Sequence, residues 1–317
     1  MAGNRGKRGG RGLDIAVTIL EYKRQMKVKG YAKNSITLYS WGLECFKDFL
    51  IARNINDLRK VTRKIMEDYQ AEIMTQPIAM ETKALKLRAV KRLFESLEQN
   101  HQLLINPAQH IVETNRQKRM PGVVLTIEEM KRLLDQPSLS LAVQIRDKAI
   151  MEVLYSTAIR SNELLSLQVY DVDLKDQVLY IRKGKGKRQR VVPLGRHAVR
   201  YLKEYLEKIR PTYAKKNPRE RALFLTNRGP ALTWNAIRAN INDYRKKAGI
   251  RKTVGLHTFR RSCATHMLQQ GADIRYIQEL LGHKYLKTTQ VYTRVMPVDV
   301  KKTHETTHPN IRGKHED

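Results

Sequence analysis

The stretch from His257 to Tyr292 holds the residues best suited to chemistry in this chain. It contains His257, Arg260, His283 and Tyr292, which are two imidazoles, a guanidinium and a phenol within one short segment. A guanidinium binds phosphate oxygens through paired donors, and a tyrosine is able to attack phosphorus as a nucleophile. The phenol is neutral at pH 7 because its ordinary pKa is about 10, so it needs a base or a strongly electropositive site. The segment therefore predicts chemistry on a phosphate.

His257 and Arg260 lie three residues apart on a predicted helix, so they share one face of it. Phe259, Cys263 and Met267 repeat at four-residue spacing on another face, which we expect to anchor the helix in a core. The polar pair would then point into a site. A solvated His-Arg pair is the alternative interpretation and the commoner fate of an isolated pair with this spacing.

Arg160 follows a long apolar segment in the run STAIRSNELLSL, and we expect its side chain to be half-buried. A half-buried arginine needs an anionic partner. The candidates are Glu163, the carboxyl end of a helix, and a substrate phosphate. Two arginines together are able to hold both non-bridging oxygens of a phosphodiester.

Lys185 lies in the run RKGKGKRQR, in which six of nine residues are basic. Gly184 and Gly186 allow a tight turn and a close approach of the backbone to a ligand. A lysine on such a turn is able to contact a phosphate or to protonate a leaving oxygen. The alternative is a basic hairpin tip that only grips DNA, and this is the interpretation preferred for the neighbouring cations Lys183, Lys187, Arg188 and Arg190.

Taken singly, His283 after a glycine is typical of a structural histidine, and Tyr292 is typical of a core aromatic residue. Metal sites are not predicted. His304 and His308 have i, i+4 spacing, and Cys263 with His266 forms a lone CxxH. However, the chain has no CxxC pair, and no carboxylate completes an HExxH-like set. We expect neither a metal nor another cofactor.

The composition points to a polyanionic partner. The chain has 317 residues, with 61 Lys and Arg against 31 Asp and Glu, a formal net charge of +30. Nucleic acid is the first choice of partner and a membrane surface the second, although a ribosome-like or nonspecific binder fits the charge equally well. No apolar run is long enough to span a bilayer, and the N-terminus lacks the apolar core of a signal peptide. With only Cys45 and Cys263 present, a reducing cytosol is the plain expectation.

The chain divides by composition into four parts. Residues 1–12 read as a flexible basic tail, 13–112 as a helical domain, 113–124 as a linker broken by Pro121-Gly122, and 125–317 as a second domain. In the helical domain, Leu38, Trp41, Cys45, Phe49 and Leu50 repeat at helical spacing after Ser35, a possible N-cap, and Thr62 is placed to cap a later helix.

The run METKALKLRAVKRLFESLEQN predicts a further helix with one apolar and one basic side. Its basic side is either a solvated face or a DNA-facing surface, and the two interpretations carry equal weight. The candidate DNA contacts on this helix are Lys83, Lys86, Lys91 and Arg92.

The second domain begins with a capping box formed by Thr126 and Glu129, and residues 141–158 predict a buried helix. The runs VLYIR and RQRVVPLG then predict a hairpin or a small antiparallel sheet. Helices resume near residue 197, another helix is expected over 233–248, and Gly271 and Gly282 occupy C-cap positions. The fold class is therefore mostly α with a small antiparallel β-sheet.

Taken together, these segments resemble the tyrosine recombinase (phage integrase) family, and most closely its Xer-like and transposon-borne site-specific recombinases. TAIRSNELLSL resembles the first arginine box and GKGKRQRVVPLG the lysine hairpin. LHTFRRSCATHMLQQGADIRYIQELLGH resembles the second box and TTQVYTRV the tyrosine box. The order and spacing agree. The resemblance implies a helical (SAM-like) core-binding domain followed by a tyrosine-recombinase catalytic domain. One departure is Ala158, where the family commonly has glycine, and another is the run Ser161-Asn162-Glu163.

The resemblance also implies roles for the matching residues. Tyr292 would attack the scissile phosphate and form a 3′-phosphotyrosyl bond. Arg160 and Arg260 would hold the non-bridging oxygens, and His283 would hydrogen-bond the phosphate. Lys185 would protonate the departing 5′ oxygen, and His257 would act as general acid/base toward the tyrosine.

The resemblance finally implies a cytoplasmic, nucleoid-associated protein that acts on double-stranded DNA with inverted-repeat sites. A homotetramer would exchange strands through a Holliday junction, with or without a second recombinase or an accessory protein. The segment after Tyr292 would pack on a neighbour, or else form a charged tail. Two alternatives remain open: a noncatalytic DNA-binding or architectural protein on the same fold, and a type IB topoisomerase-like relaxing enzyme.

Overall fold

The computed structural model describes residues 12–111, 122–182, 189–283 and 289. The chain forms two compact units, Met1–Arg119 and Met120–Asp317, and each is described by itself. The division falls inside the segment 113–124 that was expected to be a linker, although residues 112–121 lie outside the described residues. In the part of the chain that is described, no helix combines the length and the apolar character needed to cross a membrane.

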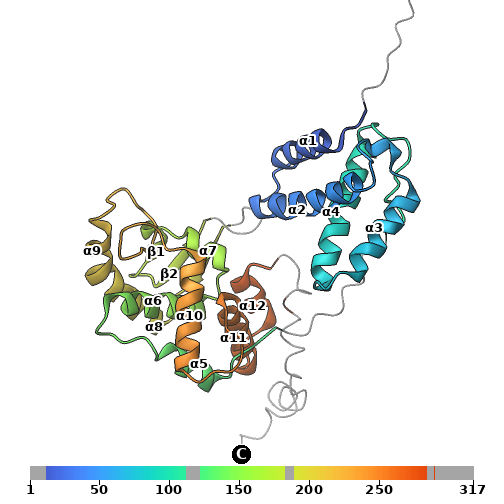
Figure 1. The fold of residues 1–317 in the computed structure, drawn as a ribbon. Coiled ribbons are helices and arrows are strands. Elements are labelled where there is room, and N and C mark those ends of the chain that lie inside the picture. Colours follow the sequence, from blue (N-terminus) through green and yellow to red (C-terminus); the bar gives the residue numbers. More distant parts are fainter. Residues whose placement is uncertain (1–11, 112–121, 183–188, 284–288, 290–317) are drawn as a thin grey trace, which may run out of the picture. The chain divides into compact units, whose positions relative to one another are not determined.

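The first unit is helical, as predicted (Figure 1). Its elements are α1 (Ile15–Val28), α2 (Lys33–Ile51), the 3-10 turn η1 (Leu58–Lys60), α3 (Arg63–Thr75) and α4 (Met80–Gln99). Thr62 caps α3 by accepting a hydrogen bond from the N–H of Ile65. The core forms where α2 packs on α4, and the ring of Phe46 meets Tyr69 and Phe94 edge-on, with centroids 4.8 and 6.0 Å apart.

The buried stripe of α2 differs from the predicted one. Leu38 and Trp41 are 48% and 43% exposed, and the helix begins at Lys33 rather than after Ser35. A cause lies at Gly42, where an added Cβ would stand 3.0 Å from the Cβ of Ala89 on α4. The close approach of the two helices at this glycine fixes which face of α2 is covered. The buried residues of the helix are Gly42, Leu43, Phe46, Phe49 and Leu50.

The second unit is mostly helical and carries one small sheet, which confirms the predicted fold class. Its first elements are α5 (Ile127–Leu134), α6 (Ala142–Thr157), α7 (Ser161–Ser166), η2 (Val169–Asp171), β1 (Val172–Asp173), β2 (Val178–Ile181) and β3 (Arg190–Pro193). The later elements are α8 (Arg196–Glu204), the π-helical turn η3 (Tyr205–Ile209), α9 (Arg210–Ala214), α10 (Trp234–Lys247), α11 (Leu256–Gln269) and α12 (Ile274–Leu281). The strands are antiparallel in the order β1-β2-β3. Thr126 and Glu129 form the predicted capping box before α5.

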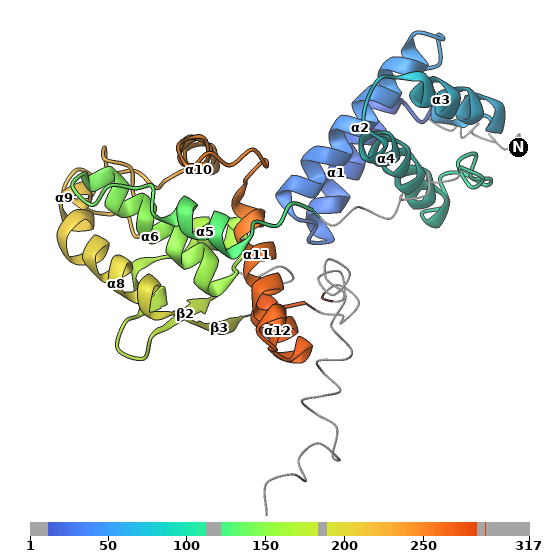
Figure 2. The ribbon, with the colours of Figure 1, turned by 90° about the horizontal axis from the view of Figure 1, so that it is seen from below.

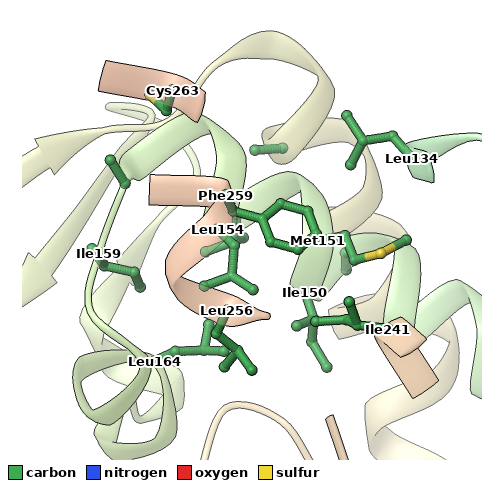
Figure 3. Close-up of a cluster of buried hydrophobic side chains, with 14 of the residues drawn as sticks. Leu134, Ile150, Met151, Leu154, Ile159, Leu164, Ile241, Leu256, Phe259 and Cys263 are labelled. Carbon is green, nitrogen blue, oxygen red and sulfur yellow. The ribbon is translucent and has the colours of Figure 1, made fainter. Parts of the chain in front are cut away.

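Helix α6 organises this unit, and Figure 2 shows it between α8 and α11, both of which it contacts. Leu154 of α6 and Phe259 of α11 are fully buried in the shared core, next to Met151 and Leu256 (Figure 3). Cys263, one turn after Phe259, is also buried, as the four-residue spacing predicted. The core therefore fixes α11 with one face inward, and this sets the direction of its polar residues.

Two helix ends turn sharply next to the predicted site. Helix α6 ends at Ala158, a fully buried residue in the left-handed region with φ 50° and ψ 28°. This conformation costs a non-glycine residue about 1–2 kcal/mol, which explains why glycine suits the position. Helix α12 ends at Gly282, where φ is 60° and an added Cβ would come within 3.2 Å of the Arg190 side chain. A side chain at 282 would add a close contact with Arg190 to the strain of a left-handed backbone, whereas Ala158 bears that backbone strain alone.

Candidate active site

Arg260 lies at the centre of the site and is only 5% exposed. It projects from α11, and its Nη1 donates to the carbonyl of Ala158 at 2.6 Å. Its Nη2 donates to the carbonyl of Leu281, also at 2.6 Å, and lies 3.1 Å from Nε2 of His283. The ends of α6 and α12 therefore hold one guanidinium between them.

His283 is held in one tautomer by its two neighbours. A guanidinium only donates hydrogen bonds, so Nε2 of His283 accepts from Arg260 and the proton lies on Nδ1. Nδ1 is 2.9 Å from Oγ1 of Thr289, which accepts that proton's hydrogen bond. Burial lowers the pKa of His283 to about 4, and the guanidinium groups of Arg260, Arg160 and Arg190 lower it in the same direction. The ring is therefore neutral at physiological pH.

Arg160 meets two of the partners expected for a half-buried arginine. Its Nη1 donates to Oε1 of Glu163 at 2.8 Å, and its Nη2 donates to the carbonyl of Gly282 at 3.0 Å. The side chain remains 22% exposed. Arg160 and Arg260 bind the carbonyls of consecutive residues, Gly282 and Leu281, so the two guanidiniums lie next to each other. We call this pair, together with His283, the arginine clamp.

Glu163 is a buried anion that binds Arg160 of the clamp, and 2% of its side chain is exposed. Burial by itself would raise the pKa of Glu163, but hydrogen bonds from Arg190 and from the N–H and guanidinium of Arg160 lower it to about 2. The carboxylate is thus charged at neutral pH. The guanidiniums of Arg160 and Arg190 carry like charges. They lie close together because both bind the negative carboxylate of Glu163.

His257 lies on the first turn of α11, three residues before Arg260, and its side chain reaches solvent. Desolvation of part of the ring lowers the pKa of His257, and the guanidinium groups of Arg261, Arg260 and Arg160 lower it further. An accessible neutral imidazole beside two clamp arginines is a suitable proton acceptor.

Lys185 and Tyr292 lie outside the described residues, as do Lys183, Lys187 and Arg188. Arg160, Arg260 and His283 are therefore the predicted catalytic residues that the structure brings into contact, with His257 on the same helix as Arg260. Thr289, which the sequence had not singled out, is fully buried against His283, three residues before Tyr292. The sequence does not reveal this contact, because a threonine three residues before a tyrosine is not typical of any particular role.

The structure corrects two of the candidate DNA contacts on α4. Lys83 and Lys86 are each only 8% exposed. The ammonium of Lys83 donates to the carbonyl of Met74, and that of Lys86 donates to Oε1 of Gln76 and lies 5.1 Å from the ring centroid of Trp41. These lysines satisfy groups inside the first unit rather than forming an exposed face.

The other two candidates on α4 differ from each other. Lys91 is partly buried and donates to the carbonyl of Ile111 at 3.3 Å. Arg92 is exposed and forms an ion pair with Glu95 at 3.0 Å. Of the four candidate contacts on this helix, Arg92 thus has the most accessible side chain.

Arg190 was also expected to grip DNA, and the structure corrects this prediction. Its side chain is 14% exposed and forms an ion pair with Glu163 at 2.8 Å. The signal that was missed is the alternation of strand residues, because Arg190 lies two positions before the buried Val192 and so on the same face of β3. It also pairs across the sheet with buried Ile181.

The CxxH pair does not resemble a metal site. Both ring nitrogens of His266 have partners, with Nδ1 2.8 Å from the hydroxyl of Tyr155 and Nε2 2.9 Å from the carbonyl of Leu125. Cys263 is buried in the core, where desolvation raises the pKa of its thiol to about 12. Within the described ranges, no three His, Cys, Asp or Glu side chains are grouped as a metal would require.

The lowered pKa of His283 predicts a pH-dependent contribution to stability. The folded pKa, about 4, lies below the ordinary 6.5, so the contribution is complete above pH 6.5 and is lost as the pH falls toward 4. We expect the difference in unfolding free energy between the wild type and His283→Gln to be largest at pH 7.5 and to shrink by pH 5. Urea denaturation at both pH values measures this. His197→Gln, at an exposed position, controls for loss of an imidazole, and a pH-independent difference for His283→Gln would contradict the assigned neutral ring.

Comparison with known proteins identifies the family of the chain. Residues 123–297 match the Phage integrase family. The chain is 33% identical over 293 residues to Tyrosine recombinase XerD of Staphylococcus epidermidis, covering 92% of this chain and 98% of that protein. It is 32% identical over 288 residues to Tyrosine recombinase XerC 2 of Ralstonia nicotianae, covering 89% and 82%.

Solved structures show the same fold. The XerH site-specific recombinase bound to a palindromic difH substrate, a post-cleavage complex, matches with a TM-score of 0.70 and 24% identity, covering 91% of this chain and 82% of that one. The Tn1549 transposon integrase in complex with a circular intermediate DNA matches with a TM-score of 0.67 and 18% identity, covering 87% and 94%. The family match covers most of the unit that holds the clamp, and the relatives match nearly the whole chain. The chain therefore belongs to the phage integrase family and is a tyrosine recombinase.

Proposed function

We propose that the protein is a site-specific DNA recombinase that cuts and rejoins strands through a 3′-phosphotyrosyl intermediate. The observation that carries the proposal is the arginine clamp, in which Arg160 and Arg260 lie side by side with neutral His283. A guanidinium pair of this kind matches the two non-bridging oxygens of a phosphodiester. The proposal adds the nucleophile Tyr292 and the acid Lys185 from their positions in the family's sequence boxes.

The reaction begins when the phenol oxygen of Tyr292 attacks the scissile phosphorus and His257 accepts the phenol proton. A bond forms between phosphorus and the tyrosine oxygen, and the bond from phosphorus to the 5′ oxygen breaks. The leaving 5′ oxygen takes a proton from the ammonium of Lys185. The second step runs in reverse with a 5′ hydroxyl from another strand, so the phosphodiester is restored without an external energy source.

The clamp stabilises the transition state by electrostatics. Negative charge grows on the equatorial oxygens as the tyrosine attacks, and fixed cations at those oxygens lower the barrier. In this structure the clamp guanidiniums are already oriented by backbone carbonyls and by Glu163. Little reorganisation is then needed when the phosphate arrives.

A suicide substrate with a nick next to the cleavage position tests the proposal directly. Cleavage releases the short fragment that carries the 5′ hydroxyl, and its loss leaves the protein attached to the DNA. We expect a covalent adduct that survives denaturing electrophoresis and whose tyrosine carries the 3′ phosphate. A protein that binds its site tightly and yields no adduct would instead be a noncatalytic DNA-binding protein on the same fold.

The proposed partner is double-stranded DNA with inverted-repeat sites, on which four copies exchange strands through a Holliday junction. Support comes from the relatives solved on DNA and from the net charge of +30. Inverted repeats around a short spacer in the DNA flanking the gene would identify the target. Relaxation of any supercoiled plasmid, without a specific site, would favour a topoisomerase-like activity instead.

Binding to DNA should weaken steeply with salt, because phosphate contacts release condensed counterions. If six or more phosphates are contacted, raising the salt from 50 to 200 mM is expected to lower the affinity by about 10³-fold or more. Fluorescence anisotropy with a labelled site across this range measures the slope. An affinity that stays constant would contradict a binding surface built on Lys and Arg.

A further inference from the structure

Arg190 contacts the groups that hold Arg160, and only 14% of its side chain is exposed. Its Nη1 and Nη2 donate to the two carboxylate oxygens of Glu163 at 3.0 and 2.8 Å, and its Nε donates to the carbonyl of Leu280 at 3.1 Å. These three contacts join β3 to α7 and to the end of α12. A fork of donors used in this way fixes the orientation of its partners as well as their charge.

Glu163 is shared between two arginines. Its Oε1 accepts from Nη1 of Arg160 and Nη1 of Arg190, and its Oε2 accepts from the backbone N–H of Arg160 and Nη2 of Arg190. Arg160 by itself gives each carboxylate oxygen one hydrogen bond, and Arg190 gives each oxygen a second one. Arg190 therefore fixes the carboxylate more firmly and offsets its negative charge, so that Arg160 and Arg260 keep their full positive charge for a phosphate.

Arg190 also touches the second partner of Arg160. Cδ and Nε of Arg190 lie within 3.2 Å of the place where a Cβ of Gly282 would be, so the side chain lies directly against that glycine. The carbonyl of Gly282 is the one that accepts from Nη2 of Arg160. Both groups that orient the Arg160 guanidinium are therefore in contact with Arg190.

We propose that Arg190 is a positioning residue, which holds Arg160 in the clamp through Glu163 and Gly282 without touching DNA. It also connects the clamp to the β2–β3 hairpin, because Arg190 is the first residue of β3 and follows Lys185 by five positions in the sequence. This inference rests on the proposed function, in which Arg160 binds the scissile phosphate and Lys185 protonates the leaving oxygen.

The test measures the single-turnover rate constant of adduct formation on the nicked substrate, at saturating protein. We expect Arg190→Gln to lower it by about 10- to 100-fold, the size expected when a catalytic group is misplaced by about 1 Å. Arg190→Lys should fall between Arg190→Gln and the wild type, since it keeps the charge but not the fork. Arg182→Gln is the matched control, because Arg182 lies on the other arm of the same hairpin and pairs with buried Asp171.

Combination with Arg160→Ala separates positioning from a loss of stability. If Arg190 acts through Arg160, adding Arg190→Gln to Arg160→Ala should change the rate by less than about threefold. An independent structural role would instead multiply the two defects and lower the melting temperature in parallel. Such multiplication, or an Arg190→Gln rate equal to that of the wild type, would overturn the inference while leaving the proposed function intact. A wild type that forms no adduct would overturn both.

Discussion

Replacement of Tyr292 by phenylalanine is expected to abolish the covalent protein–DNA adduct. The substitution removes one oxygen atom, and that atom is the proposed nucleophile. Denaturing electrophoresis of labelled nicked DNA should show no shifted band for Tyr292→Phe at times when the wild type has reacted fully.

Binding must be unchanged for this result to identify the nucleophile. We expect the variant to bind the same DNA with the wild-type affinity, because phenylalanine keeps the aromatic ring and lacks only the hydroxyl. Tyr276, an exposed tyrosine on α12, provides the matched control, and Tyr276→Phe should form the adduct at the normal rate. An adduct that persists in Tyr292→Phe would assign the attack to another residue.

Arg260→Ala should lower the rate of adduct formation by about 10²- to 10³-fold, as expected when one fixed donor to the transition-state charge is removed. The physical reason is specific to this site, because the Arg260 guanidinium binds two carbonyls and contacts His283. Removing it takes away the hydrogen bonds that it donates to those groups, and leaves the phosphate with one of the two clamp arginines. Single-turnover cleavage at saturating protein measures the loss separately from binding.

Two further variants show whether the loss is one of chemistry. Arg260→Lys keeps the positive charge but cannot reach both carbonyls, so we expect most of the defect to remain. Arg275→Ala removes an exposed arginine from α12 and should leave the rate unchanged. Thermal melting of all three variants identifies any loss of folded protein. A rate for Arg260→Ala within about threefold of the wild type would remove Arg260 from the proposed mechanism.

The sequence was informative where a residue's role depends on local spacing. Arg260 faces a site because Phe259 and Cys263 anchor the same helix in the core, and the four-residue repeat predicted this arrangement. The capping box at Thr126 and the glycine that ends α12 were likewise predicted from the sequence, because each feature favours a particular residue type at one position. For Arg160 the sequence offered several alternative partners. The structure contains two of them together, Glu163 and the carboxyl end of a helix.

The sequence failed where a cation's role depends on residues distant in the chain. Lys83, Lys86 and Arg190 lie in basic runs that are typical of DNA-binding surfaces, yet all three face inward. Nothing local distinguishes a lysine that binds the carbonyl of Met74 from one that binds a phosphate. Such a distinction requires the packing of one helix or strand against another, which only the folded chain provides.

The carbonyls that hold the clamp arginines have an electrostatic consequence. Ala158 ends α6, while Leu281 and Gly282 end α12, so both guanidiniums lie at helix carboxyl ends. A helix carries about half a negative charge at this end, from its aligned peptide dipoles. The two helices therefore supply a built-in counter-charge that keeps the arginines assembled before DNA is bound. An incoming phosphate then meets two arginines that the helix ends already hold in place, and the same partial charges keep them there after the strands are rejoined.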